Sequence, residues 1–284
     1  MKVPAEFDEI RPYSPEELPA VFNELLADEQ FMQVALSMLG GMPKEQFKAA
    51  LLSCQTNLEV QKMFFYPLLK QLLAKCSAGC DMNAEALADK NQQYTFISNH
   101  RDIVLDSALL SVMLVDNYFP TTVEIAIGDN LLIYPWIKKL VRVNKSFIVQ
   151  RSLSMREMLA SSMRMSKYMH FAVREKGENI WIAQREGRAK DSNDRTQESV
   201  LKMMAMGGEG TPVERLSALN IVPLAISYEF DPCDYLKAKE FQQKRDNPEF
   251  KKSKQDDLQN MQTGIFGYKG RIHYHAAPCI NAWL

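Results

Sequence analysis

A histidine and two aspartates lie close together in residues 99–106, which read NHRDIVLD. A carboxylate that accepts a hydrogen bond from one imidazole nitrogen fixes the tautomer of the ring. The other nitrogen is then free to take a proton from a hydroxyl. His100 is therefore a candidate general base, with Asp102 or Asp106 as its partner carboxylate. If Asp102 caps the next helix, Asp106 lies one turn further along roughly the same side. The alternative is a surface histidine beside two solvated carboxylates.

A second segment has the composition of an anion site. Residues 184–191 read QREGRAKD and place a Glu-Gly pair among three cations. Glycine lets the backbone approach a phosphate closely, and arginine and lysine supply charge and hydrogen-bond donors. The alternative is an ordinary charged turn on the surface.

Strand-like runs come just before both segments. Runs rich in β-branched and aromatic residues predict strands at residues 94–98, 123–127, 146–150, 179–183, 220–227 and 271–275. Helical patterns lie between most of them, and a capping box at residues 154–157 opens one of these helices. This alternation predicts an α/β fold, with a mostly parallel sheet flanked by helices. Ligands of such sheets bind beyond the carboxyl ends of the strands, where both candidate segments lie.

The first part of the chain has a different pattern. Apolar residues recur there at helical spacing, and no strand-like alternation is present before Tyr94. We therefore expect an N-terminal helical region over residues 1–88 and an α/β domain over residues 89–284. The charged stretch at residues 237–257 predicts a solvated pair of helices interrupted at Pro248.

Several other kinds of site are excluded by their missing motifs. The chain has no G-x-S-x-G elbow, which argues against an α/β-hydrolase, and no P-loop pattern. His273 and His275 alternate on a predicted strand, but no second pair of ligands lies nearby in the sequence to complete a zinc site. We therefore expect no metal.

Four blocks, in this order, resemble those of the glycerolipid acyltransferase family, which includes glycerol-3-phosphate and 1-acylglycerol-3-phosphate acyltransferases. The blocks are the Asn-His-to-Asp segment at residues 99–106, a glycine-to-proline stretch at 128–135 leading to the strand that ends in Arg151, EGRAK at 186–190, and a proline-containing strand at 221–225. The resemblance covers about residues 90–280, and the α/β domain is accordingly expected to be an acyltransferase domain.

The sequence departs from the family pattern at two places. The family aspartate comes five positions after the histidine, whereas Asp106 follows His100 by six, so we expect the turn before the helix to absorb one residue. In the third block Arg188 directly follows Gly187, where many members have a residue between them, and Lys190 could therefore share the anion-binding role.

The resemblance implies transfer of a fatty acyl group from a thioester to a hydroxyl of glycerol-3-phosphate or a lysophospholipid, in phospholipid biosynthesis. His100 would be the general base and Asp106 would orient it, with no acyl-enzyme. The residues that would hold the phosphate or other anionic head of the acceptor are Arg151, Glu186, Gly187, Arg188 and Lys190. Acyl-CoA or acyl carrier protein would be the co-substrate, with no further cofactor. The alternatives are acylation of another lipid head, such as an N-acyl amino acid, and a non-catalytic lipid-binding protein of the same fold.

Composition limits the partners and the compartment. Lysine and arginine total 34 against 35 acidic residues in 284, which argues against nucleic-acid binding. Five cysteines do not suggest a disulfide framework, and the N-terminus lacks the apolar core of a signal peptide. No apolar run reaches the roughly 18 residues of a membrane span. We expect a cytoplasmic protein that contacts the inner face of the membrane peripherally, through apolar faces around residues 63–67.

Overall fold

The computed structural model describes residues 3–151, 153–191 and 193–284. Its centre is a seven-stranded sheet of order β1-β7-β6-β2-β5-β3-β4, in which every pair is parallel except β6 with β7. The strands are β1 (Gly79–Asn83), β2 (Thr95–Ser98), β3 (Val123–Gly128), β4 (Ser146–Val149), β5 (Asn179–Ala183), β6 (Ile221–Tyr228) and β7 (Arg271–Ala276). The predicted α/β fold with a mostly parallel sheet is confirmed.

Helices cover both faces of the sheet, so successive side chains of a central strand enter different cores. In β2, Phe96 packs with helix α6 (Leu105–Asp116), and Ile97 packs with helix α8 (Met155–Phe171). The other elements on these faces are η1 (Ala5–Phe7), α5 (Tyr66–Cys76), η5 (Ala172–Lys176), α9 (Glu198–Met204), α10 (Pro212–Ser217) and η6 (Ile280–Ala282).

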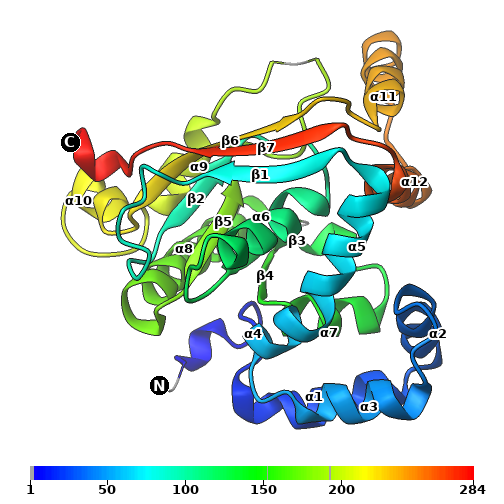
Figure 1. Cartoon of the computed structure of the whole chain (residues 1–284). Helices are drawn as coiled ribbons and strands as arrows, with labels where there is room; N and C mark the ends of the chain where they lie inside the picture. The colour runs from blue at the N-terminus through cyan, green and yellow to red at the C-terminus, as the bar shows by residue number, and fades with distance from the viewer. Residues whose placement is uncertain (1–2, 152, 192) are drawn as a thin grey trace.

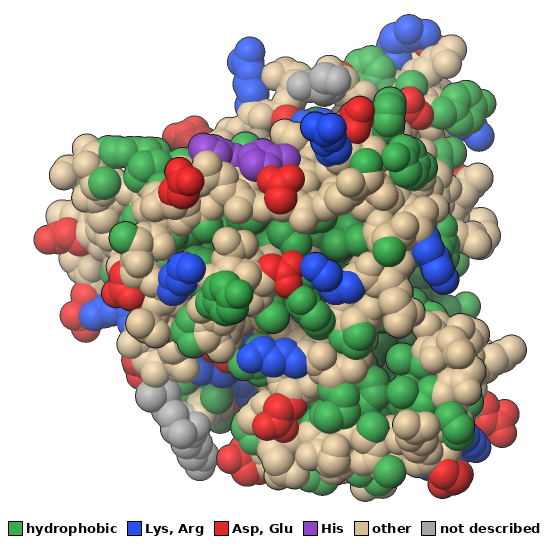
Figure 2. Space-filling view, in the orientation of Figure 1, with side chains coloured by type: hydrophobic (Ala, Val, Ile, Leu, Met, Phe, Trp, Pro, Cys, Tyr) green, Lys and Arg blue, Asp and Glu red, His purple; other side chains and the backbone are tan. Residues whose placement is uncertain are grey.

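The N-terminal helices form a third apolar core. They are α1 (Leu18–Ala27), α2 (Glu29–Met38), α3 (Lys44–Ser53), α4 (Asn57–Val60) and η3 (Gln61–Phe65), and they pack with α7 (Pro135–Val143). The short helix η2 (Pro15–Glu17) precedes α1 and has no buried residue. In Figure 1, α1 and α3 lie at the bottom and α2 at the lower right, with α4 and α7 between α1 and the sheet. In Figure 2, hydrophobic side chains gather over these helices at the lower right.

Three features of the fold differ from the expectations. The prediction of no strand before Tyr94 is wrong, because β1 pairs with β7 and joins the sheet from within the expected helical region. The boundary at residues 88 and 89 itself stays a prediction. The segment at residues 63–67 does not present one continuous apolar face, because Phe64 is buried in the N-terminal core; membrane contact itself stays a prediction. Its neighbour Met63 is exposed.

The third difference concerns the charged stretch after β6. It forms α11 (Asp234–Asp246) and α12 (Lys254–Phe266), which lie at the upper right of Figure 1. The pair of helices is not solvated throughout, since Lys237 and Glu240 are buried. No helix in the described ranges is long and apolar enough to cross a membrane.

The register of the sheet brings the candidate segments to one edge. Ser98 at the end of β2 pairs with Ala183 at the end of β5 and with Leu224 in β6. Residues 99–106 and 184–191 therefore leave neighbouring strands side by side. The end of β3 pairs with the end of β4, which places Arg151 along the same edge. The short helix η4 (Asp129–Leu131) follows β3 there.

Candidate active site

His100 and Asp106 are in direct contact at the end of β2. Nδ1 of His100 lies 2.8 Å from Oδ2 of Asp106, and the carboxylate is completely buried in the first turn of α6. The same oxygen accepts hydrogen bonds from the backbone N–H of Arg101 at 2.6 Å and of Asp102 at 3.0 Å. The ring packs edge-on against Trp181. The imidazole is thus held from one side, and Nε2 is the nitrogen left for a substrate.

Asp102, the other candidate partner of His100, has a different structural role. Its Oδ1 accepts hydrogen bonds from the backbone N–H of Val104 at 2.9 Å and of Leu105 at 2.8 Å, so it caps the start of α6. Burial raises the pKa of Asp102, and the neighbouring Asp106 adds to the rise. The residues between His100 and α6 form a loop, which absorbs the extra position in the spacing. A catalytic role for His100 and Asp106 stays a prediction.

Two tyrosines that the sequence did not single out complete the surroundings of Asp106. The hydroxyl of Tyr228 in β6 donates to Oδ1 of Asp106 at 3.2 Å, and the hydroxyl of Tyr274 in β7 donates to its backbone carbonyl at 2.8 Å. Burial raises the pKa of Tyr228 far above its usual value, and the charge of Asp106 raises it further. Tyr228 is therefore a neutral donor that holds the second oxygen of the carboxylate. Nothing in the strand pattern marks either tyrosine as functional.

This arrangement predicts a moderate effect of Tyr228→Phe. The variant removes one hydrogen bond to the carboxylate of Asp106 and leaves the other three in place, so we expect kcat to fall about 3- to 10-fold, equivalent to roughly 1 kcal/mol. The kcat of the purified variant in a steady-state acyl-transfer assay measures this effect. Tyr274→Phe is the matched control, because it loses a bond to backbone and should reduce thermal stability while retaining kcat. Equal kcat in the wild type and Tyr228→Phe would refute this role.

A cavity of about 300 Å³ opens beside His100. This volume is at the lower end of the range typical of small-molecule sites. Apolar residues of its wall come from the loop before α6, from β3 and from α7, and include Ile103, Val104, Ile125, Ile127, Ile137 and Val141. The same wall carries the cations Arg151, Arg185, Arg188, Lys190 and Lys252. The cavity therefore suits a ligand that has both an apolar chain and an anionic group.

Arg188 is the most buried cation of this wall, with 6% of its surface exposed. Its Nη2 donates to Oδ1 of Asn260 at 2.9 Å, and its Nη1 is buried with no partner among the described residues. Gly187 just before it has a φ of +67°, a conformation that favours glycine. A buried guanidinium N–H without an acceptor is costly. Arg188 also lines the cavity beside His100, where its positive charge would attract an anion.

The other predicted anion-binding residues take different positions. Arg151 pairs with Glu186 at 2.9 Å, and its backbone N–H donates to Asp129 at 3.2 Å. Glu186 is largely exposed and touches Arg151 rather than the cavity. Lys190 faces Glu240 at 3.4 Å. Burial lowers the pKa of Lys190, and Glu240 opposes that shift. The structure thus brings Arg151, Gly187, Arg188 and Lys190 to the cavity of His100. Glu186 is not part of the cavity lining and forms an ion pair with Arg151.

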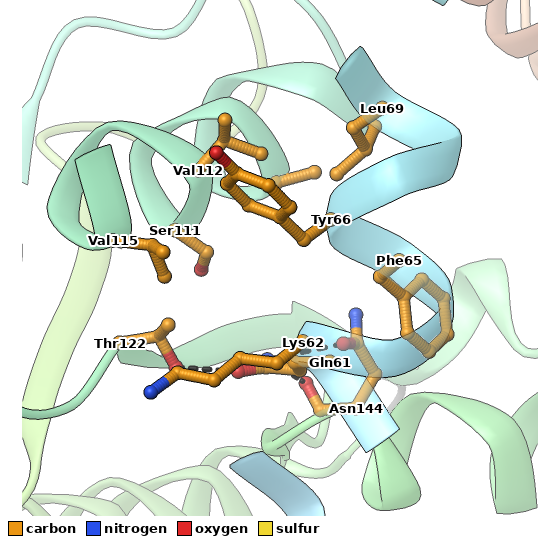
Figure 3. Close-up of a pocket in the computed structure, with 11 residues that line it drawn as sticks. Gln61, Lys62, Phe65, Tyr66, Leu69, Ser111, Val112, Val115, Thr122 and Asn144 are labelled. Carbon is orange, nitrogen blue, oxygen red and sulfur yellow. Dashed lines mark hydrogen bonds between the residues drawn. The ribbon is translucent and has the colours of Figure 1, made fainter. Parts of the chain in front are cut away.

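Further pockets lie elsewhere among the described residues, including a polar one of about 450 Å³ lined by Glu9, Lys138 and Arg142. Figure 3 shows a small one between α5 and α6, where Phe65, Leu69, Val112 and Val115 face a polar floor of Gln61, Thr122 and Asn144. Its volume of about 20 Å³ has room for roughly one water molecule, so it cannot hold a substrate. Another, of about 90 Å³ among the N-terminal helices, is lined only by apolar residues and offers no chemistry.

The histidines of β7 form a separate surface feature, the purple patch in Figure 2. His273 is hydrogen-bonded to Asp81 of β1, and the ring of His275 lies 6.3 Å from that of His273. Within residues 3–151, 153–191 and 193–284, no three His, Cys, Asp or Glu side chains are arranged to hold a metal ion.

Comparisons with known proteins identify the family. The acyltransferase family model matches residues 81–227, more than half of the chain. No curated protein matches by sequence. Among solved structures, the chain is similar to PlsC from Thermotoga maritima, a 1-acyl-sn-glycerophosphate acyltransferase, with 11% identity and a TM-score of 0.43 over 93% of this chain and 83% of that one. On the family model, this chain belongs to the acyltransferase family.

Proposed function

We propose that the protein transfers a fatty acyl group from an acyl thioester to a hydroxyl of glycerol-3-phosphate or a lysophospholipid. One observation carries this proposal: His100, which contacts Asp106, and the buried Arg188 line the same cavity, together with apolar residues. The apolar residues suit an acyl chain, Arg188 suits a phosphate, and His100 is then available to the hydroxyl that is acylated.

The reaction follows from this placement. Nε2 of His100 takes the proton of the acceptor hydroxyl while its oxygen attacks the thioester carbonyl. Asp106 holds Nδ1 and stabilises the imidazolium that forms. As the tetrahedral intermediate collapses, the C–S bond breaks, and the leaving thiolate receives the same proton from His100. The products are the acyl ester and the free thiol, and His100 is restored to its neutral form.

The donor and the location are further parts of the proposal. Acyl-CoA or acyl carrier protein supplies the acyl group, with no other cofactor. The product is a lipid, so we propose that the protein works in phospholipid biosynthesis, in the cytoplasm, in peripheral contact with the inner face of the membrane.

A panel of acceptors tests the function and the role of Arg188 together. Thiol release from acyl-CoA is followed with glycerol-3-phosphate, a lysophospholipid, an N-acyl amino acid bearing a hydroxyl, and a monoacylglycerol without phosphate. We expect the phosphorylated acceptors to be preferred. Arg188→Met should raise their KM about 30-fold or more, because a buried charge-assisted contact is lost, and should change kcat far less.

Arg245→Met is the control for this variant, because Arg245 is an exposed residue of α11 that forms an ion pair with Asp246. It should leave every KM unchanged. A preference for the N-acyl amino acid would assign a different lipid head to the site. Absence of thiol release with every acceptor would support a non-catalytic lipid-binding protein and contradict the proposal.

A further inference from the structure

The pair of helices α11 and α12 lies beyond residue 227, where the match to the acyltransferase family model ends. It is nevertheless built into the candidate active site. Nζ of Lys237 donates to the carbonyl of Arg101 at 2.8 Å, in the loop that follows His100. Gly264 lies so close to Asp102 that a Cβ there would stand 1.9 Å from Oδ2. Helix α12 also supplies Leu258 and Met261 to the cavity wall.

The residue of α12 that contacts the anion site is Asn260. It is buried, with 8% of its surface exposed, and its Oδ1 accepts the hydrogen bond from Nη2 of Arg188 at 2.9 Å. Its Nδ2 donates to the carbonyl of Asp256, one turn earlier in the helix. Because a guanidinium only donates hydrogen bonds, the amide oxygen must be the atom that faces Arg188. Both ends of the amide are thereby fixed, and the guanidinium is fixed with them.

Three of the five cations that line the cavity pair with carboxylates, whereas Arg185 donates to the backbone carbonyl of Asn193 at 2.9 Å and Arg188 donates to an amide. Arg151 pairs with Glu186, Lys190 with Glu240, and Lys252 with Asp257 at 2.6 Å. The side-chain oxygen that holds Arg188 belongs instead to an uncharged amide. A carboxylate at this position would also orient the guanidinium, but it would neutralise the charge and compete with an incoming phosphate.

We propose that Asn260 is the positioning residue of the anion site: it aims Arg188 at the phosphate of the acceptor and leaves the positive charge free to bind it. The inference rests on the proposed function and adds a residue from outside the matched family region. The selectivity of the enzyme for phosphorylated acceptors then depends on α12 as well as on the EGRAK turn.

Asn260→Asp tests this, because aspartate has nearly the same shape and adds a charge beside Arg188, although it also loses the donor that meets the carbonyl of Asp256. We expect KM for glycerol-3-phosphate to rise about tenfold or more, with kcat and KM for acyl-CoA changed less than about threefold. Asn260→Ala, which frees the guanidinium without neutralising it, should raise the same KM by a smaller factor. Gln259→Glu, at the adjacent exposed position, adds the same charge outside the site and should leave every KM unchanged.

A binding measurement provides the second readout. Inorganic phosphate and glycerol-3-phosphate should raise the melting temperature of the wild type, and Asn260→Asp should reduce that shift. An unchanged KM and an unchanged shift in Asn260→Asp, with an active and phosphate-selective wild type, would overturn the role of Asn260 alone. An equal rise of KM for both substrates, together with a loss of stability, would overturn it in favour of a structural role. A wild type that transfers no acyl group would instead contradict the proposed function.

Discussion

Asp106→Asn is expected to lower kcat about 10²- to 10⁴-fold, because it removes the charge that stabilises the imidazolium of His100. Asparagine can keep most of the local geometry. Its amide oxygen can take the place of Oδ2 and accept from His100 and from the backbone N–H groups of Arg101 and Asp102. Its nitrogen can donate to the hydroxyl of Tyr228. The fold should therefore persist, and the loss in rate should report the charge of the carboxylate.

Asp102→Asn is the matched control for this variant. It also removes one buried carboxylate close to His100, and asparagine caps a helix about as well as aspartate does. We expect kcat within about threefold of the wild type, since a lost charge away from the imidazole changes little of the barrier. Steady-state kinetics of the two variants decide between the carboxylates. Equal losses in both, or a larger loss in Asp102→Asn, would show that Asp106 is not the special partner of His100.

His100→Ala should reduce kcat by about 10²- to 10⁴-fold, the usual contribution of a positioned general base. The side chain is 14% exposed and borders the cavity, so its removal should leave the fold intact. Imidazole added to the variant can enter the vacated space and should restore part of the rate. Circular dichroism and binding of glycerol-3-phosphate serve as controls that the protein is folded and that the site of Arg188 is still formed. Transfer at the rate of the wild type would exclude His100 as the base.

The sheet was largely predictable because its strands are short runs of β-branched and aromatic residues, such as those of β2, β3 and β5. Strand β1 has the sequence GCDMN, with no β-branched residue, and it forms because β7 offers it a partner. Helix α7 was not singled out either, although its sequence carries a local signal, with Pro135 at the first helical position and a strongly amphipathic pattern. Tertiary contacts decide β1, and local patterns do not encode that strand.

The candidate site was predictable where its residues follow strands. His100, Arg151 and Arg188 each come just after a strand, and the register of a parallel sheet places strand ends together. Spacing alone left Asp102 and Asp106 open as partners, because the turn between them sets which one faces the imidazole. Tyr228 reaches Asp106 across 122 residues of chain, and Asn260 reaches Arg188 across 72. Residues that join a site from such distances carry no local signal.

One measurement tests the direct transfer to an alcohol most simply. Purified wild-type protein is mixed with acyl-CoA, with and without glycerol-3-phosphate, and free thiol, lipid product and the mass of the intact protein are recorded. The account predicts that thiol is released only with the acceptor, that acylated glycerol-3-phosphate forms in equal amount, and that the mass of the protein does not change. Stoichiometric thiol release without acceptor, accompanied by an acylated protein, would contradict it.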